Sequence, residues 1–492
     1  MNRHLATPLA TSRLAQMSRH RPKFMKPRRR PLIFARLWHP QGLESSTSSI
    51  FYMFFYASCL SLANDAGHNR RVISGSRHMS SNSSLTPSAR AFEPLQLGPI
   101  TLPNRFVKAG TYEGMNFANG PSAALVKHHV DIARGGVGMT TLGYTAVHPD
   151  GRTFEEETSI GADNLVRFRA LTDAVHGAGA RVSLQLGHCG TMTRTPKRST
   201  RKPLGPSKTL NLYGAMVGAL FTSEMTSADM QTVGDQFVAA AKHAVAAGFD
   251  AIELHMGHGY LLSQFLSPLA NKRNDQYGGS AENRLRFPLE VTERVLAAVG
   301  DQIAVIAKLN LRDGARSGVE IADSIKTAQA LQSAGLHGLV MTGGFSPYSP
   351  MYLFRGNSPV PSMLQTEKSA WNRFLLKLGA KTAFRDTPFE EMYFLKHALQ
   401  MREAVTMPLG LLGGLRSGDN VAEAMRAGFD FVVLGRPLIA QADFVSRLAK
   451  DPSARSNCIN CNRCVAEFST PGGVRCVLGE PNDSALNARP AA

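Results

Sequence analysis

The sequence predicts an α/β fold, a (β/α)8 TIM barrel preceded by a basic N-terminal extension. Four Ala-rich helical patterns end in Ala-Gly and run directly into an apolar strand. Gly stops a helix at that place because it adopts a positive φ freely. The strands are short, apolar and unalternating, as in a parallel sheet that is buried on both faces. Eight strands alternate with helices, and eight is the number that closes this barrel.

The eight predicted strands alternate with helical patterns along more than 300 residues. They are 105–109, 137–142, 181–186, 250–255, 303–309, 337–342, 407–412 and 431–434. An open doubly wound sheet is the alternative, but no Gly-x-Gly-x-x-Gly turn follows an early strand. The segment 344–406, between the sixth and seventh strands, is long and holds one predicted helix that ends near Val405. We expect a lid or subdomain over the barrel mouth there.

Residues 1–90 carry most of the excess positive charge. They hold fourteen Lys and Arg and two acidic residues, a net +12 of the +18 of the whole chain. Residues 91–492 are therefore only mildly basic, which does not favour a nucleic-acid-binding protein. Arg-rich, acid-poor composition is typical of organelle transit segments, and the apolar run 50–63 is short for a membrane span. A transit or anchor segment and a spurious upstream start both stay open, so the predicted localisation is mitochondrial or cytoplasmic.

Glycines and an arginine follow the last two strands. Gly413 and Gly414 follow the seventh strand, and Gly435 and Arg436 follow the eighth. Glycines at such places let backbone N–H groups approach an anion, and a guanidinium matches the oxygens of a phosphate. The loops after strands seven and eight are the usual phosphate site of this barrel. The pattern therefore predicts a phosphorylated ligand.

Polar side chains end the third, fourth and fifth strands. Gln185 ends the third strand and has a donor and an acceptor for an amide-like ring edge. Lys308 ends the fifth and, as a buried ammonium, needs an anion or an electron-rich carbonyl. His255, His258 and Tyr260 follow the fourth strand without a His-Glu-x-x-His helix or a third metal ligand. We expect the histidines to be hydrogen-bond donors to a small molecule, and Tyr260 to be a general acid.

The run HMGHGYLLSQFLSPLANKRNDQYGGSAENR (255–284) resembles the signature of the old yellow enzyme family, the FMN-dependent ene-reductases among the NADH:flavin oxidoreductases. Further runs resemble the same family in order. They are FEPLQLGPITLPNRFVKAG (92–110), GGVGMTTLGYTAVHPDGR (135–152), SLQLGHCG (183–190), GLLGGLRS (410–417) and VVLGRPLIAQADF (432–444). The resemblance covers about 92–450.

The resemblance implies that NAD(P)H reduces non-covalently bound FMN, whose N5 then delivers hydride to the β-carbon of an activated alkene. His255 and His258 would hydrogen-bond the carbonyl or nitro oxygen of the alkene, and Tyr260 would protonate its α-carbon. Gln185 and Lys308 would contact the flavin ring. The other cofactor-binding residues that the resemblance implies are Ala109, Gly110, Tyr112, Tyr144, Gly413, Gly414, Gly435 and Arg436. The implied partners are an alkene substrate and NAD(P)H, with no nucleic acid and no firm membrane association; a homo-oligomer stays open.

Three positions depart from the family pattern. Lys308 stands where most members carry Arg, which keeps the charge and loses the planar fork. Tyr112 stands where a Thr or Cys usually meets the flavin, so redox tuning can differ. Tyr144 stands where a small residue is common. Its ring either narrows the pocket or points away.

Four of the six cysteines form the pattern Cys458-x2-Cys461-x2-Cys464-x11-Cys476. The spacing suits a metal or an iron–sulfur site. It resembles the cluster of the dienoyl-CoA-reductase-like members of the family, with one residue fewer in the middle gap. A [4Fe-4S] cluster, a structural zinc and free thiols stay open. The alternative function is accordingly an FMN/iron–sulfur barrel oxidoreductase of the dienoyl-CoA reductase or amine dehydrogenase type.

The predicted domain organisation has three parts. Residues 1–90 form the basic extension, which is either disordered or a targeting segment. Residues 91–450 form the FMN-binding barrel, with the insertion 344–406. Residues 451–492 form a Cys-containing C-terminal tail.

Overall fold

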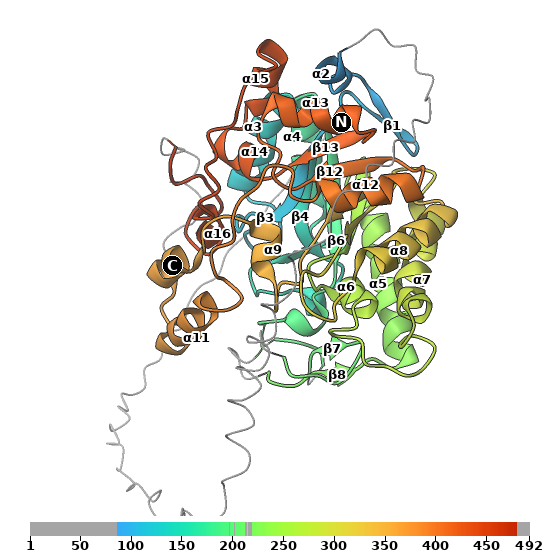
Figure 1. Cartoon of the computed structure of the whole chain (residues 1–492). Coiled ribbons are helices and arrows are strands. Elements are labelled where there is room, and N and C mark those ends of the chain that lie inside the picture. The colour runs from blue at the N-terminus through green and yellow to red at the C-terminus, as the bar shows by residue number, and fades with distance from the viewer. Residues whose placement is uncertain (1–85, 196, 201, 212–213, 215–218, 480–492) are drawn as a thin grey trace, which may run out of the picture. The chain divides into compact units, whose positions relative to one another are not determined.

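Eight parallel strands close on themselves in the computed structural model (Figure 1). The structure describes residues 86–195, 197–200, 202–211, 214 and 219–479. The predictions for the transit segment and for the apolar run 50–63 lie outside these described residues. The predicted division of the chain at residues 90 and 450 stays a prediction.

The barrel strands begin within two residues of their predicted starts. They are β3 (Phe106–Tyr112), β4 (Met139–Ala146), β6 (Arg181–Gly187), β9 (Ala251–Met256), β10 (Ala304–Asn310), β11 (Gly338–Thr342), β12 (Leu409–Leu412) and β13 (Phe431–Leu434). Each pairs in parallel with its neighbours in the order β3-β13-β12-β11-β10-β9-β6-β4, and the pairing of β3 with β4 closes the ring. The predicted TIM barrel is confirmed.

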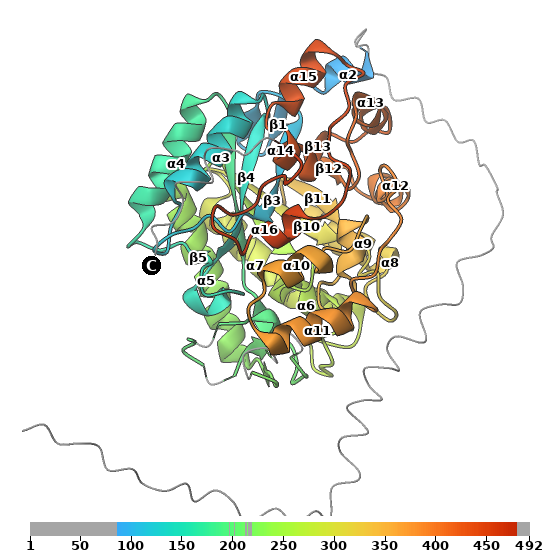
Figure 2. The ribbon, with the colours of Figure 1, turned by 90° about the vertical axis from the view of Figure 1, so that its left-hand side faces the viewer.

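Helices run between the strands and cover the outside of the barrel (Figures 1 and 2). They are α3 (Ala123–Arg134), α4 (Leu165–Gly177), α5 (Ser227–Ala246), α7 (Ala281–Val299), α8 (Ile321–Ser333), α12 (Leu395–Ala404) and α13 (Gly418–Arg426). The four predicted Ala-Gly stops have φ near 90° at their glycines, namely Gly179, Gly248, Gly335 and Gly428. At the other end of α5, Thr226 and Asp229 form a reciprocal capping box. Local sequence thus sets both ends of this helix.

A short hairpin that the sequence did not predict closes one end of the barrel. Strands β1 (Leu95–Leu97) and β2 (Ile100–Leu102) pair antiparallel ahead of β3. Leu95, Leu97 and Leu102 form one cluster with side chains that fill the barrel interior. The fit is close, because a Cβ on residue 338 would lie 2.9 Å from Cδ1 of Leu97.

The insertion between β11 and β12 holds three short helices that the sequence did not predict. They are α9 (Pro350–Phe354), α10 (Val360–Thr366) and α11 (Ala370–Ala380). The predicted helix near Val405 is α12. Of these helices, α10 packs against α16 (Cys464–Glu467) of the C-terminal segment (Figure 2).

Shorter elements complete the described fold. They are α2 (Pro87–Arg90), β5 (Thr158–Ser159), β7 (Leu204–Gly205), β8 (Ser223–Glu224), α6 (Leu261–Leu266), α14 (Arg436–Ala440), α15 (Phe444–Lys450) and the 3-10 turns Pro149–Gly151 and Gly190–Met192. Within the described ranges, no helix combines the length and the apolar character needed to cross a bilayer.

Leu97→Ala is expected to lower the free energy of unfolding by about 2–5 kcal/mol, because it removes buried contacts and leaves a cavity in the barrel interior. Leu97 is fully buried, whereas Leu478 is 51% exposed. Urea unfolding followed by circular dichroism measures the change, with Leu478→Ala as the matched control. Equal effects of the two variants would contradict the role of the hairpin as a plug.

Candidate active site

The side chains predicted for the site gather where the strands end. Gln185 lies near the end of β6, His255 near the end of β9 and Lys308 near the end of β10. All three are buried, with exposed fractions of 3%, 3% and 1%. Strand register places His255 directly beside Lys308. The carboxyl ends of the strands therefore form a polar, water-poor floor, as a barrel of this kind predicts.

His255, His258 and Tyr260 form one cluster of rings above that floor. The ring of His255 lies 5.1 Å from that of His258, at 80°, and 4.4 Å from that of Tyr260, at 32°. His258 has a positive φ of 59°, which turns the chain after β9. Its Nε2 is hydrogen-bonded with Oγ1 of Thr342 at 2.8 Å, and its backbone N–H donates to Oδ1 of Asn310 at 3.1 Å. The structure thus brings together the three residues that the sequence predicted to act together.

Both imidazoles are uncharged at neutral pH. Burial, and after it the positive charge of Lys308, lowers the pKa of His258 to about 3. Burial, followed by His258 and Lys308, lowers the pKa of His255 well below its usual value. A neutral imidazole has one N–H donor and one acceptor nitrogen. The pair can therefore donate hydrogen bonds to a substrate oxygen without carrying a charge.

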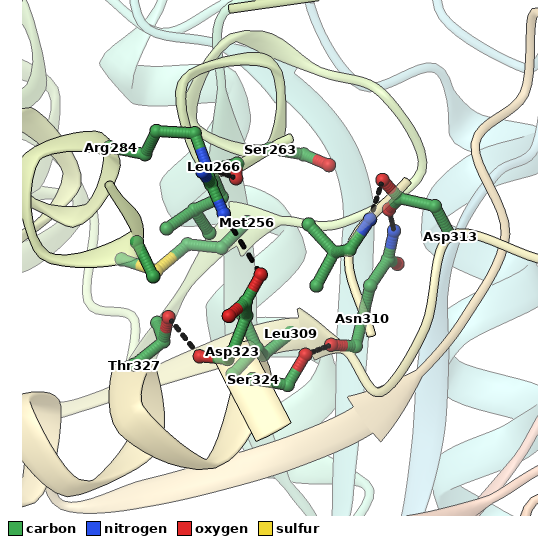
Figure 3. Close-up of a pocket in the computed structure, with 12 residues that line it drawn as sticks. Met256, Ser263, Leu266, Arg284, Leu309, Asn310, Asp313, Asp323, Ser324 and Thr327 are labelled. Carbon is green, nitrogen blue, oxygen red and sulfur yellow. Dashed lines mark hydrogen bonds and ion pairs between the residues drawn. The ribbon is translucent and has the colours of Figure 1, made fainter. Parts of the chain in front are cut away.

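A pocket near the ends of β9 and β10 is lined by polar side chains, one of which contacts the loop that carries His258 (Figure 3). Figure 3 shows Asn310 pointing toward Asp313, and its Nδ2 donates to Oδ1 of Asp313 at 2.9 Å. Arg284 and Asp323 form an ion pair of 2.9 Å across the same pocket. Asn310 also accepts from the backbone N–H of His258, so Asn310, held by Asp313, positions the histidine loop.

A carboxylate that the sequence analysis did not identify meets the predicted lysine. Oε1 of Glu253 lies 2.8 Å from Nζ of Lys308 and accepts from Nε2 of Gln185 at 2.6 Å. Nζ of Lys308 also donates to the carbonyl oxygen of Gly110 at 3.4 Å. The expected negative partner of Lys308 is therefore a protein side chain. An acid inside the apolar strand that ends at His255 was the signal that could have found it.

A second buried ion pair lies at the end of β3. Lys108 and Glu113 are 1% and 2% exposed and form an ion pair and hydrogen bond. Burial lowers the pKa of Lys108 and raises that of Glu113, and the opposite charge of the partner acts against each shift. Thr111 donates to Oε1 of Glu113 at 2.8 Å. This pair was not predicted from the sequence. Lys108 lies inside β3 and Glu113 directly follows that strand.

Of the two unusual tyrosines, Tyr144 points into the site. Its ring lies 4.7 Å from that of Tyr260 and 6.3 Å from that of His255. Its phenol donates to the carbonyl oxygen of Gly151 at 2.6 Å, and burial raises its pKa well above the usual value. Tyr112 lies in another aromatic cluster, where its ring stacks 5.8 Å from Phe154. The ring of Tyr144 therefore lies beside the histidine–tyrosine cluster and does not point away from it, and its effect on the width of the pocket stays a prediction.

The predicted phosphate end brings glycines and arginines together. Gly413 and Gly414 have φ of 103° and 81°, and a Cβ on either would approach Tyr393 within 2.9 Å. Gly435 precedes α14. Nη1 of Arg436 donates to the carbonyl oxygens of residues 354 and 355, at 2.8 and 3.0 Å, and to Oδ1 of Asn462, at 2.6 Å. The predicted arginine thus holds the insertion and the C-terminal segment to the barrel.

Two further arginines near this end were not predicted. Nε of Arg355 and Nε of Arg416 are buried and have no hydrogen-bond partner within the described part of the chain. Arg355 lies over the ring of Tyr393, with Cζ 5.1 Å from the ring centre. Arg416 lies two residues after the glycine pair in the sequence, which was a usable signal.

These residues fit the flavin mononucleotide that the resemblance implies. At the ring end, Gln185 and Lys308 offer donors, and a Cβ on residue 110 would lie 2.9 Å from Nε2 of Gln185, so only Gly leaves room. Ala109, before Gly110, is buried. At the phosphate end, Nε of Arg355 has no hydrogen-bond partner in the described part of the chain and is a donor for an anion, whereas Nε of Arg416 lies 3.8 Å from Oε1 of Glu391. The assignment of individual residues to the cofactor stays a prediction.

The four clustered cysteines are free thiols in the structure. Cys458, Cys461, Cys464 and Cys476 are each partly buried. Among the residues that the structure describes, no group of three or more His, Cys, Asp or Glu side chains is arranged to hold a metal ion. The predicted metal or iron–sulfur site stays a prediction.

Comparison with known proteins finds relatives that are flavin-family or NAD(P)H-dependent oxidoreductases or reductases. Residues 90–341 match the NADH:flavin oxidoreductase / NADH oxidase family. The 4,4'-dithiodibutanoate disulfide reductase of Rhodococcus erythropolis is 40% identical over 395 residues, which are 80% of this chain and 96% of that protein. The NADPH dehydrogenase of Bacillus subtilis (strain 168) is 26% identical and covers 73% of this chain and 94% of its own length. Morphinone reductase in complex with tetrahydroNAD has a TM-score of 0.58 at 23% identity, over 75% of this chain and 93% of its own.

The match confirms the resemblance to the old yellow enzyme family that five sequence runs and the 255–284 signature carried. It also confirms an enzyme that uses a flavin and NAD(P)H. The chain belongs to the NADH:flavin oxidoreductase / NADH oxidase family, as an FMN-dependent NAD(P)H oxidoreductase.

Proposed function

We propose that the enzyme reduces the activated C=C bond of α,β-unsaturated carbonyl or related compounds. The observation that carries the proposal is the cluster of two uncharged imidazoles and one phenol, in which the rings of His258 and Tyr260 lie 5.1 and 4.4 Å from that of the buried His255. When bound, FMN reduced by NAD(P)H would supply the hydride that the β-carbon receives. The protein would supply hydrogen bonds and the proton.

His255 and His258 would donate hydrogen bonds to the carbonyl or nitro oxygen of the alkene. Negative charge grows on that oxygen as the β-carbon gains hydride, so donors fixed in a buried site stabilise the transition state more than the ground state. Uncharged donors suit this role because the buried floor already holds Lys308 beside them. Tyr260 would then give its proton to the α-carbon and recover it from solvent.

A second acceptor class is a linear disulfide. The Rhodococcus relative, 40% identical over 96% of its length, is a 4,4'-dithiodibutanoate disulfide reductase. Two electrons and two protons break one S–S bond and give two thiols. A hydride from reduced flavin supplies both electrons and one proton, and Tyr260 would supply the second proton. The same cluster therefore suits both acceptors, and direct assay separates them.

Tyr260→Phe tests the proposed role of the phenol. The rate at which a 2-enone reoxidises the reduced enzyme is expected to fall about 10²–10⁴-fold, because the proton donor is removed. Reduction of the flavin by NAD(P)H is expected to change little. Anaerobic stopped-flow absorbance measures the two half-reactions separately, with Tyr277→Phe as the matched control. The phenol of Tyr277 lies outside the proposed site and donates a hydrogen bond to Oε1 of Glu290. A wild-type enzyme that takes up no flavin, or whose reduced flavin no enone reoxidises, would overturn the proposal.

His258→Gln is expected to make the protein less sensitive to acid. The folded state holds His258 neutral down to about pH 3, whereas the unfolded chain takes up its proton below the usual pKa of 6.5. Unfolding is therefore favoured progressively as the pH falls from about 6.5 to about 3. The free energy of unfolding of the variant should fall less steeply, by up to about 1.4 kcal/mol per pH unit. Urea titrations at stepped pH measure this slope, with the partly exposed His176→Gln as control. Parallel slopes for His258→Gln and wild type would contradict a neutral buried imidazole.

Tyr144→Ala is expected to widen the acceptor range. The ring of Tyr144 lies beside Tyr260 and is held by its bond to Gly151, so it should exclude wide ring systems and admit slender ones. The variant should raise kcat/KM for a bulky cyclic enone about tenfold or more relative to a linear enone or 4,4'-dithiodibutanoate. Tyr144→Phe keeps the ring and serves as control. An unchanged ratio of specificities in the Ala variant would rule out Tyr144 as a size filter.

A further inference from the structure

Helix α11 carries a row of large apolar side chains that the described structure leaves exposed. Trp371, Phe374 and Leu378 are 59%, 56% and 42% exposed. Their spacing of three and four residues places them on one face of the helix. The rings of Trp371 and Phe374 stack with centres 5.7 Å apart at 25°. Leu376, on the opposite side of the helix, and Leu375, beside the row, are partly buried. We call the exposed row the α11 face.

Basic side chains border the α11 face. Residues 368–385 contain five Lys and Arg and no Asp or Glu. The five are Lys368, Arg373, Lys377, Lys381 and Arg385, and all are exposed. Arg373, Lys377 and Lys381 follow one another at intervals of four residues, so they run alongside the apolar row. None of the five forms a salt bridge with a described acidic side chain.

We propose that the α11 face docks peripherally on a membrane surface rich in anionic lipids. Trp and Phe favour the boundary between headgroups and acyl chains, where their apolar rings leave water. Lys and Arg beside them meet lipid phosphates, and their long stems lie along apolar surface. An eleven-residue helix with three apolar anchors supports reversible, salt-sensitive binding. This property is independent of the reaction proposed above.

The positive charge around the α11 face favours an anionic lipid surface over a second copy of the chain as its binding partner. In a two-fold dimer the same patch lies on both sides of the interface. Five cations of one copy would then face five of the other, with only the two flanking acids, Glu367 and Asp386, to offset them. An anionic lipid surface complements the same charges. Figure 2 shows α11 on the outside of the ribbon, next to α10, where a flat surface can reach it.

Fluorescence of Trp371 tests the proposal locally. The chain has two tryptophans, so Trp38→Phe in the full-length protein leaves Trp371 as the single reporter. Vesicles of phosphatidylcholine with phosphatidylglycerol should shift its emission to shorter wavelength, and brominated lipid should quench it. Phosphatidylcholine alone should do neither, and added salt should reverse the shift because it screens the charges. This reporter separates α11 from any binding by the basic residues 1–90.

Two sets of variants in the same background complete the test. Lys377→Gln with Lys381→Gln should weaken the vesicle-dependent shift at least about tenfold in lipid concentration. Lys242→Gln with Lys450→Gln, which removes two exposed lysines elsewhere, should leave the shift unchanged. Unaltered circular dichroism and NAD(P)H oxidation show that each variant is folded.

Either of two results would overturn the proposal. The protein could sediment with anionic vesicles while Trp371 emission stays unchanged, which would place the contact elsewhere in the chain. Alternatively, Trp371 emission could shift with protein concentration in the absence of lipid, with a matching increase of mass in analytical ultracentrifugation. The α11 face would then be an interface between copies.

Discussion

The need to neutralise buried ammonium groups shapes the mouth of this barrel. Closing eight strands brings Lys108 and Lys308 to a floor where each is about 1% exposed. A buried charge is tolerated only with a well-placed partner, and removal of one partner of such a pair typically costs 3–5 kcal/mol. Glu113 and Glu253 are those partners. These ion pairs therefore fix the positions of the strand ends that carry the four residues. The side chains next to them are fixed as a result.

The same floor sets the protonation of the site above it. The charge of Lys308 adds to burial in lowering the pKa of His255 and of His258. A salt-bridged lysine in a dry site disfavours a second cation nearby, and a neutral imidazole is the result. The carboxylate of Glu253 holds the lysine in place, and burial together with the charge of that lysine keeps the histidines neutral. Under the proposed reaction, neutral histidines would donate hydrogen bonds to the developing oxyanion.

The alternating strands and helices of the barrel were predicted well from the sequence, because they depend on local sequence patterns. All eight strands and the Ala-Gly stops depend on neighbouring residues alone, and so does the order in which polar side chains reach the barrel mouth. The interaction partners of individual side chains were harder to predict. Glu253 was missed since pairing with Lys308 depends on register between two strands, and the short helices α9 and α10 were missed since few of their residues are buried. The direction of the Tyr144 ring also depends on tertiary packing: a Cβ on residue 187 would lie 2.4 Å from its Cε2, so the ring fits only against Gly187.

Arg436 shows how one side chain can join parts of a chain that lie far apart in sequence. Its Nη1 donates to the carbonyl oxygens of residues 354 and 355 in the insertion and to Oδ1 of Asn462 in the C-terminal segment. A guanidinium has five N–H donors in a planar fork, and Nη1 carries two of them. Nε and Nη2 still carry three donors, enough for an anion at the end of β13. An arginine can meet both demands at once, whereas a lysine, with a single ammonium, would have to give up one of them. An anion bound at this position would therefore be linked through Arg436 to the insertion and to the segment that carries the clustered cysteines.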